Sequence, residues 1–151
     1  PAGSKRVEEL KQIVSWAQRP FILKGIMTAR GAEKALEAGA SGIVVSNHGG
    51  RVLDHCPATA EVLPEIVDAV GGKMTIFVDG AIRSGMDMFK ALALGADAVL
   101  IGRPFVTTVY GGGEEGVQLY VQKLKAELAD TMRMCGAHSL AEIKRSMLFG
   151  F

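Results

Sequence analysis

The glycine-rich run at residues 46–51, Ser-Asn-His-Gly-Gly-Arg, holds the side chains best suited to chemistry in this sequence. An imidazole titrates close to neutrality, so a histidine held in a loop, as His48 would be, suits proton transfer. Arg51 follows closely and can hold a carboxylate with two parallel hydrogen bonds. The run therefore predicts a base beside an anion-binding residue. A loop histidine next to a solvated arginine fits the spacing about equally well.

Two further stretches have the composition of phosphate-binding turns. Residues 79–85 read Asp-Gly-Ala-Ile-Arg-Ser-Gly, and residues 102–104 read Gly-Arg-Pro. Each directly follows an apolar run, where backbone N–H groups can cradle a phosphate while Arg83 and Arg103 add positive charge. Together they indicate a phosphorylated cofactor or substrate.

Lys24 is the remaining candidate for a functional residue. It directly follows a short apolar run, at the predicted carboxyl end of a strand. A lysine at that place can hold an electron-rich ring or form a Schiff base. The simpler alternative is a lysine that extends its ammonium into water at the end of a strand. His55 and Cys56 lie near His48, but no further cysteine or carboxylate completes a ligand set, so we expect no metal.

The elements that must position these residues alternate between short apolar runs and helical patterns. The predicted strands are 21–23, 42–45, 74–78 and 98–101, and the predicted helices are 6–18, 29–37, 58–70, 84–94, 114–134 and 139–148, with a glycine loop at 111–113. Continuous apolar strands separated by helices are typical of an α/β fold with a parallel sheet, in which the loops at the carboxyl ends of the strands carry the chemistry. On the last long helix, Lys123, Lys125, Glu127 and Asp130 predict a solvated face.

An internal repeat indicates how many units the chain holds. Lys-Ala-Leu followed by Gly-Ala occurs at 34–40 and again at 90–96, and the strand after each copy matches too. The chain thus contains four βα units, which is half of a (β/α)8 barrel of about 250 residues. An open doubly wound sheet is the competing architecture. A half barrel would expose two apolar strand edges, so we expect it to pair with a missing half or with a second copy of itself.

The composition limits the classes of function. The chain has 151 residues, of which 48% are hydrophobic and 22% charged, and its formal net charge is +1. Such balance does not indicate a nucleic-acid partner, and no apolar run reaches the roughly 18 residues of a membrane span. Two separated cysteines fit a reducing cytoplasm. Since the chain starts at Pro1 without a signal pattern, we expect it to be a processed or cut piece.

With these motifs in view, the chain resembles the C-terminal half of the FMN-dependent α-hydroxy-acid oxidase and dehydrogenase family, which includes glycolate oxidase, lactate oxidase and mandelate dehydrogenase. The resemblance covers nearly all of residues 20–148. It is carried by Leu-Lys-Gly at 23–25, the run 46–51 with its continuation to Thr59, the loop 79–83 and Gly-Arg-Pro at 102–104. It implies a (β/α)8 barrel of which this chain supplies strands five to eight. The domain organisation is then a leading helix at 1–19, four βα units at 20–110 and C-terminal helices at 111–151.

The resemblance also implies roles for individual residues. Lys24 matches the lysine that faces the N1/C2 carbonyl edge of FMN, and Ser46 matches a flavin contact. His48 matches the catalytic base, which removes a proton from a 2-hydroxy acid, and Arg51 matches the arginine that binds the substrate carboxylate. The family's ribityl- and phosphate-binding positions correspond to Asp79, Gly80, Ala81, Arg83, Gly102 and Arg103.

Two features depart from the family pattern. The family usually has glycine where this sequence has Ala81, and a methyl group there would weaken FMN binding. The family's N-terminal half supplies active-site tyrosines, a second substrate arginine and the carboxylate that orients the histidine, and this chain carries none of them. The full protein is expected to act on a lactate- or glycolate-like acid and to form a homo-oligomer.

Two other functions fit parts of the pattern. One is a catalytically incomplete half barrel that binds a phosphate ligand or associates with itself. The other is a different phosphate-binding barrel enzyme, such as a flavin-dependent isomerase or a nucleotide dehydrogenase, which would not need the pair of His48 and Arg51.

Overall fold

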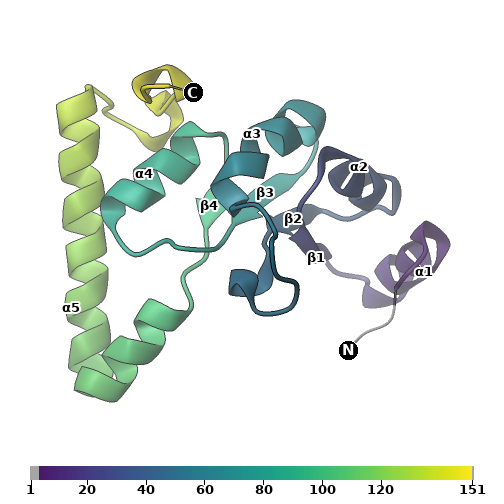
Figure 1. Ribbon diagram of the computed structural model, residues 1–151, viewed down its shortest axis with the longest axis horizontal. Helices are drawn as coiled ribbons and strands as arrows, with labels where there is room; N and C mark the ends of the chain where they lie inside the picture. Colours follow the sequence, from purple (N-terminus) through teal and green to yellow (C-terminus); the bar gives the residue numbers. More distant parts are fainter. Residues whose placement is uncertain (1–3, 151) are drawn as a thin grey trace.

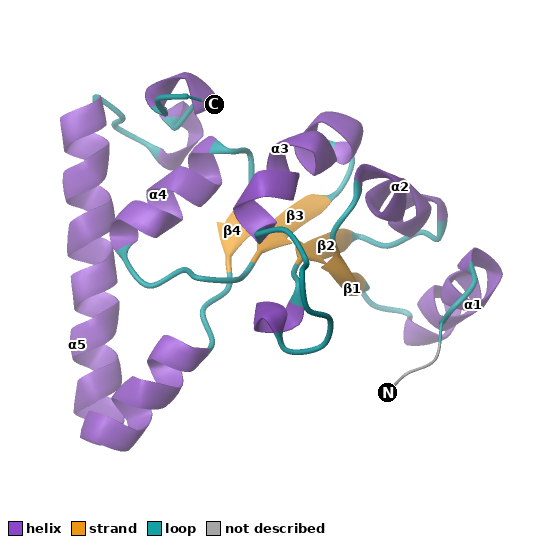
Figure 2. Cartoon of the chain, viewed as in Figure 1, coloured by secondary structure: helices purple, strands orange, loops and turns teal. Residues whose placement is uncertain are grey.

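The computed structural model describes residues 4–150 and centres on one parallel sheet with the strand order β1-β2-β3-β4 (Figures 1 and 2). The strands are β1 (Ile22–Ile26), β2 (Gly42–Val45), β3 (Thr75–Val78) and β4 (Ala98–Val99). The helices are α1 (Val7–Ala17), α2 (Ala29–Glu37), α3 (Thr59–Val70), α4 (Gly85–Ala93) and α5 (Arg103–Cys135), with 3-10 turns η1 (His48–Gly50), η2 (Leu140–Glu142) and η3 (Arg145–Met147). The predicted α/β class with four βα units is confirmed. No helix in the described part of the chain is both long and apolar enough to cross a membrane.

The main core lies between α2, α3 and one face of the sheet. Side chains alternate along a strand, and residues in register share a face. Ile43 is in register with Ile76, and Val45 with Val78. These four side chains are fully buried against small and branched residues of the two helices. The buried members from the helices are Ala32, Ala35, Leu63, Ile66 and Val70.

The same alternation places Lys24 on the opposite face of the sheet. Leu23 pairs with Ile43 and packs on the core, whereas Lys24 pairs with Val44, which is in turn in register with Phe77. Lys24 therefore points to the face that α2 and α3 do not cover. In a closed barrel this face lies inside.

Both terminal strands differ from the prediction. The prediction of a fully buried strand at 21–23 is wrong. β1 is longer and mostly exposed, and Ile22 is 46% exposed. β1 is the first strand of the sheet and has a neighbour on one side only, within the described residues. The strand predicted at 98–101 shortens to Ala98–Val99 for the same reason, and Leu100 keeps only a single backbone bond, to Val78.

The glycine loop predicted at 111–113 narrows to a break at Gly113, because Gly111 and Gly112 still belong to the first part of α5. Gly113 has φ 54° and ψ −137°, a conformation open essentially to glycine alone, and it bends α5 sharply while both flanks stay helical (Figure 1). The helix predicted at 139–148 is replaced by the two 3-10 turns η2 and η3.

Helices α4 and α5 approach each other unusually closely at Gly85. This buried glycine is the first residue of α4. An added Cβ would lie 2.6 Å from the Glu127 carbonyl carbon and would also overlap the Leu128 backbone nitrogen. The missing side chain thus allows two helix backbones to touch.

This contact predicts that Gly85→Ala destabilises the protein by about 1–3 kcal/mol, because backbone atoms cannot move aside as flexible side chains do. Gly111→Ala is the matched control, since an added Cβ there meets nothing within 4 Å. The urea midpoint should fall for the first variant and stay level or rise for the second. Equal midpoints would show that the close contact is not a constraint.

Candidate active site at the strand ends

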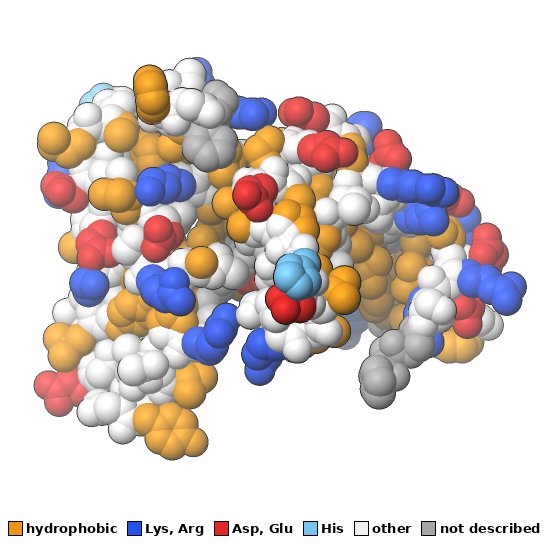
Figure 3. Space-filling model, viewed as in Figure 1, with side chains coloured by type: hydrophobic (Ala, Val, Ile, Leu, Met, Phe, Trp, Pro, Cys, Tyr) orange, Lys and Arg blue, Asp and Glu red, His pale blue; other side chains and the backbone are white. Residues whose placement is uncertain are grey.

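A cleft of about 690 Å³ opens at the carboxyl ends of the strands, and it is lined by Lys24 of β1 and by the segments that follow β2, β3 and β4. Figure 3 shows Lys and Arg side chains gathered beside the hollow between the bend of α5 and the central loop. Of the residues singled out in the sequence, the structure brings these into the wall of the cleft: Lys24, His48, Arg51, Asp79, Gly80, Ala81, Arg83, Gly102 and Arg103. The lining includes four Lys and Arg side chains but only one carboxylate, so the cleft suits an anionic ligand.

Lys24 connects the ends of three strands. Its ammonium donates to the Ser46 hydroxyl over 2.7 Å and pairs with Asp79 Oδ2 over 2.5 Å. Ser46 is 2% exposed and lies behind the lysine rather than in the cleft wall. The lysine charge is therefore held in one place, and the alternative of a lysine extended freely into water is wrong.

The loop that carries His48 folds through consecutive left-handed residues. His48, Gly49 and Gly50 have φ values of 58°, 68° and 70°. Such a turn strains a residue with a side chain, and it is held by local hydrogen bonds. The Ser46 hydroxyl accepts the His48 backbone N–H over 3.1 Å, and the Asn47 side chain accepts that of Gly49 over the same distance.

This turn leaves the His48 side chain exposed at the cleft, together with Arg51. The Arg51 Nε donates to the His48 carbonyl over 3.4 Å, which links the backbone of one to the side chain of the other. Both residues line the same cleft as Lys24. The structure therefore brings both residues of the run 46–51 into one cleft, while their roles stay a prediction.

The turn after β3 is similarly constrained. Gly80 and Ala81 have φ values of 95° and 60°. The buried Thr59 donates from its hydroxyl to the Asp79 carbonyl over 2.6 Å, and an added Cβ on Gly80 would lie 3.0 Å from that hydroxyl. Sequence reasoning did not single out Thr59 as a site residue, although it lies in the stretch that carries the family resemblance.

The two arginines that follow β3 and β4 both face the cleft. The Arg103 guanidinium lies over the backbone of Gly49, where an added Cβ would be 2.6 Å from its terminal nitrogen. Neither Arg83 nor Arg103 forms an ion pair with a carboxylate within residues 4–150. Their positive charges thus remain for a ligand.

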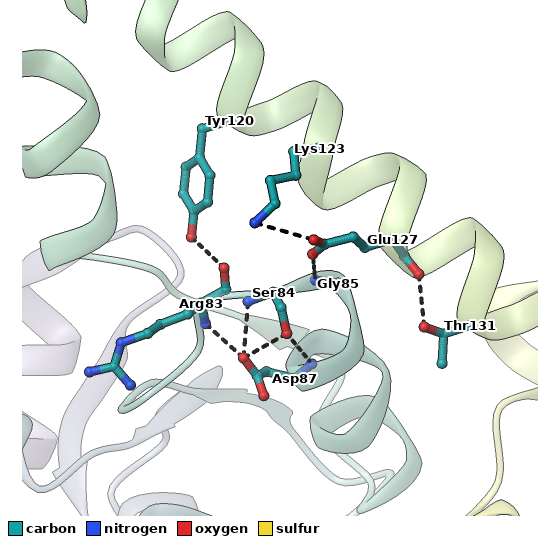
Figure 4. A network of polar contacts seen from close by, with 8 residues as sticks. All are labelled: Arg83, Ser84, Gly85, Asp87, Tyr120, Lys123, Glu127 and Thr131. Carbon is teal, nitrogen blue, oxygen red and sulfur yellow. Dashed lines mark hydrogen bonds and ion pairs between the residues drawn. The ribbon is translucent and has the colours of Figure 1, made fainter. Parts of the chain in front are cut away.

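Behind this turn, side chains of α4 and α5 hold the backbone (Figure 4). Asp87 Oδ2 accepts the N–H groups of Arg83 and Ser84 and the Ser84 hydroxyl, over 2.8–3.0 Å. Glu127 Oε2 accepts the Gly85 N–H over 2.8 Å, and the Tyr120 hydroxyl donates to the Arg83 carbonyl over 2.9 Å.

The prediction that Glu127 lies on a solvated helix face is wrong, because its carboxylate accepts a hydrogen bond from the backbone of α4. The spacing Ser84-x-x-Asp87 is a capping box that the sequence displays. No sequence signal connects Tyr120 or Glu127 to residues so distant along the chain.

The hydrogen bonds of this network shift the pKa of several groups. Burial raises the pKa of Asp87, but the bonds from Ser84 and from the backbone of Arg83 and Ser84 outweigh it and leave the pKa below its usual value. The backbone bond from Gly85 is the largest influence on Glu127 and lowers its pKa. Burial raises the pKa of Tyr120, whose hydroxyl donates to the Arg83 carbonyl.

One protein family matches the sequence over almost its entire length. A family model described as FMN-dependent dehydrogenase matches residues 2–149.

Individual relatives agree with this match. The chain is 49% identical over 142 residues to the peroxisomal (S)-2-hydroxy-acid oxidase GLO4 of Oryza sativa subsp. japonica, covering 94% of this chain and 38% of that protein. It is 47% identical over 137 residues to glycolate oxidase of Spinacia oleracea, covering 88% of this chain and 37% of that protein. The chain therefore spans well under half the length of these curated relatives.

Solved structures agree as well. The crystal structure of mandelate oxidase superposes with a TM-score of 0.90 at 43% sequence identity, over 95% of this chain and 42% of that one. A complex of mandelate oxidase with (S)-4-hydroxymandelic acid gives the same TM-score and identity over 40% of its chain.

The left-handed conformation of Ala81 predicts that Ala81→Gly raises the free energy of unfolding by about 0.5–1 kcal/mol, because the Cβ strain removed exceeds the entropy that glycine adds to the unfolded chain. Ala126→Gly, on the exposed face of α5, should lower it by a similar amount. Urea unfolding of both variants checks the signs. A loss of stability for Ala81→Gly would contradict the strain.

The lowered pKa of Asp87 predicts an acid-dependent stability. In the unfolded chain this carboxyl returns to its usual pKa of 3.8, so the unfolded state binds protons more readily. The contribution is complete at neutral pH and is lost as the pH falls through the lower pKa of the folded state. Asp87→Asn should therefore be less stable than the parent at pH 7, and its unfolding free energy should fall less on acidification to about pH 3. Asp68→Asn on α3, at an exposed carboxylate, is the control, and a parallel acid profile for Asp87→Asn would contradict the prediction.

Proposed function

The chain belongs to the FMN-dependent dehydrogenase family, and from this premise we propose that the protein oxidises a small 2-hydroxy acid, such as lactate or glycolate, to the 2-oxo acid with FMN, and that this chain supplies the C-terminal half of its barrel. The proposal rests on the cleft that Lys24, His48 and Arg51 share with Arg83 and Arg103, two arginines that form no ion pair within residues 4–150. A base, a carboxylate-binding group and a phosphate-binding group then face one cleft.

The chemistry of the cleft fits FMN. Asp79 Oδ1 is the buried side-chain oxygen left without a hydrogen-bond partner among the described residues. A buried carboxylate oxygen without a donor is costly, and a ribityl hydroxyl can supply that donor. The cleft volume of about 690 Å³ lies in the range of cofactor sites.

The phosphate would lie between Arg83 and Arg103. Two guanidinium groups can hold its oxygens with charge-assisted hydrogen bonds. The N–H groups of Arg83, Ser84 and Gly85 are already taken by Asp87 and Glu127, so further backbone donors must come from the turn before them, at Gly80 and Ala81. Gly102, directly before α5, contributes an open backbone beside Arg103.

The isoalloxazine ring would lie against Lys24, on the sheet face opposite the core. FMN supplies the acceptor for the two electrons that the substrate loses. The ammonium of Lys24, fixed by Ser46 and Asp79, would stabilise negative charge on a bound flavin ring.

His48 and Arg51 would act on the substrate itself. Conversion of a 2-hydroxy acid to a 2-oxo acid releases two electrons and two protons. The His48 imidazole would take one of these protons, from the α-carbon or from the hydroxyl, and the other would go with the two electrons to the cofactor. Arg51 would hold the carboxylate so that the first proton faces the base. The chemistry needs both side chains to face the same substrate, and both line the same cleft.

The rest of the barrel would complete the site. The relatives are more than twice as long as this chain. At the two edges of its sheet, Ile22 of β1 and Leu100, directly after β4, are exposed to solvent. We infer that the N-terminal βα units of the protein cover these strands. Formation of a homo-oligomer and a cytoplasmic location also remain predictions.

The assignment of His48 predicts that His48→Ala abolishes reduction of bound flavin by L-lactate or glycolate, with a loss of at least about 100-fold in rate, while flavin remains bound. The visible spectrum of the intact protein, recorded anaerobically before and after addition of the acid, measures both quantities. His138→Ala, an exposed histidine beyond α5, is the matched control and should bleach at the parent rate. Normal bleaching in His48→Ala would exclude His48 as the base, and a parent protein without flavin affinity would exclude the proposed function.

A further inference from the structure

The bend in α5 brings the two arms of this helix side by side. The first arm, residues 103–112, begins with Arg103, and the second, residues 114–135, runs back along α4 (Figure 1). At the bend, a Cβ added to Gly116 would lie 2.5 Å from the Thr108 carbonyl oxygen, so the two backbones are in contact. One helix therefore connects the region after β4 with the region after β3.

Tyr120 joins the two arms to the turn after β3. Its ring packs edge-on against Phe105 of the first arm, with 5.0 Å between centroids. Its hydroxyl donates to the carbonyl of Arg83 over 2.9 Å. The Tyr120 side chain thus contacts Phe105, two residues after Arg103, and the backbone of Arg83. It also lines the cleft.

Glu127 makes a second attachment two turns further along α5. It accepts the Gly85 N–H over 2.8 Å and pairs with Lys123 over 3.3 Å, as Figure 4 shows. Because Gly85 has no side chain, the backbones of α4 and α5 meet there and leave little freedom for sliding. The backbone of residues 83–85 is held from α5 at both ends.

We propose that Tyr120 and Glu127 are positioning residues for the phosphate end of the cofactor, because α5 presents Arg103 from its first arm and holds the backbone of Arg83 with its second. The bent helix then sets the spacing between the two guanidinium groups. The inference rests on the proposed function for the identity of the ligand, and neither residue needs to touch the phosphate.

A positioning role differs from general support of the fold in what it does to ligand affinity. Riboflavin is FMN without its phosphate, so it binds the same ring site without using Arg83 and Arg103. Misplacing one arginine lowers affinity for FMN alone, whereas loosening the whole fold weakens both flavins. The ratio of the two dissociation constants therefore isolates the phosphate end.

The experiment measures both dissociation constants by flavin fluorescence titration of the intact protein and its variants. Tyr120→Phe removes the bond to Arg83 and keeps the ring contact with Phe105. It should raise the dissociation constant for FMN by about 3- to 10-fold and leave that for riboflavin within about twofold of the parent. Glu127→Ala should have a similar selective effect, and Glu127→Gln should recover part of it, because an amide oxygen still accepts the Gly85 N–H.

Two substitutions on the same helix serve as matched controls. Tyr110→Phe makes the same chemical change at a tyrosine that is 89% exposed, and Glu115→Ala removes an exposed carboxylate near the bend. Both should leave the ratio unchanged.

Equal weakening of both flavins by Tyr120→Phe, or no weakening of either, would overturn the positioning role. A parent protein that prefers FMN to riboflavin would still support the proposed function in that case. A parent protein that binds neither flavin would overturn the proposed function and this inference with it.

Discussion

The contact of the Lys24 ammonium with Ser46 and Asp79 is the constraint on which the site depends. It ties together the carboxyl ends of β1, β2 and β3, and each partner lies directly after or within its strand. The lysine side chain is about half exposed, so the ion pair adds little to stability by itself. Its importance is geometric, because it holds a positive charge where the loop with His48 and the turn with Ala81 both begin.

The sheet explains why these residues meet at all. In a parallel sheet every strand runs in the same direction, so the loops after successive strands open on one edge. Alternation then divides the side chains between the two faces. Ile43, Val45 and their neighbours fill the core with α2 and α3, while Lys24 lies on the other face. That second face is the interior of a barrel, and four strands cover only part of it.

Much of this architecture follows from local patterns. Short branched runs with helical stretches between them predict the four βα units and their parallel order. The patterns fail at the edges and turns: β1 is exposed, β4 is short, α5 passes through Gly113, and 139–148 forms two 3-10 turns. Edge exposure depends on which strand has a neighbour, and three consecutive glycines at 111–113 are locally as compatible with a loop as with a bend between helical arms.

The sequence by itself determined the fold class, the number of βα units and the charged residues that face the cleft, because periodicity and the glycine- and arginine-rich turns after the later strands are local properties of the chain. Only the tertiary structure decided that Ser46 is buried behind Lys24, that Ala81 is left-handed, and that Tyr120 and Glu127 hold the turn at Arg83. Those contacts join residues far apart along the chain. They form when the bend at Gly113 returns α5 along α4, and the hydrogen-bonding partner of a side chain over such a separation has no signature in sequence spacing.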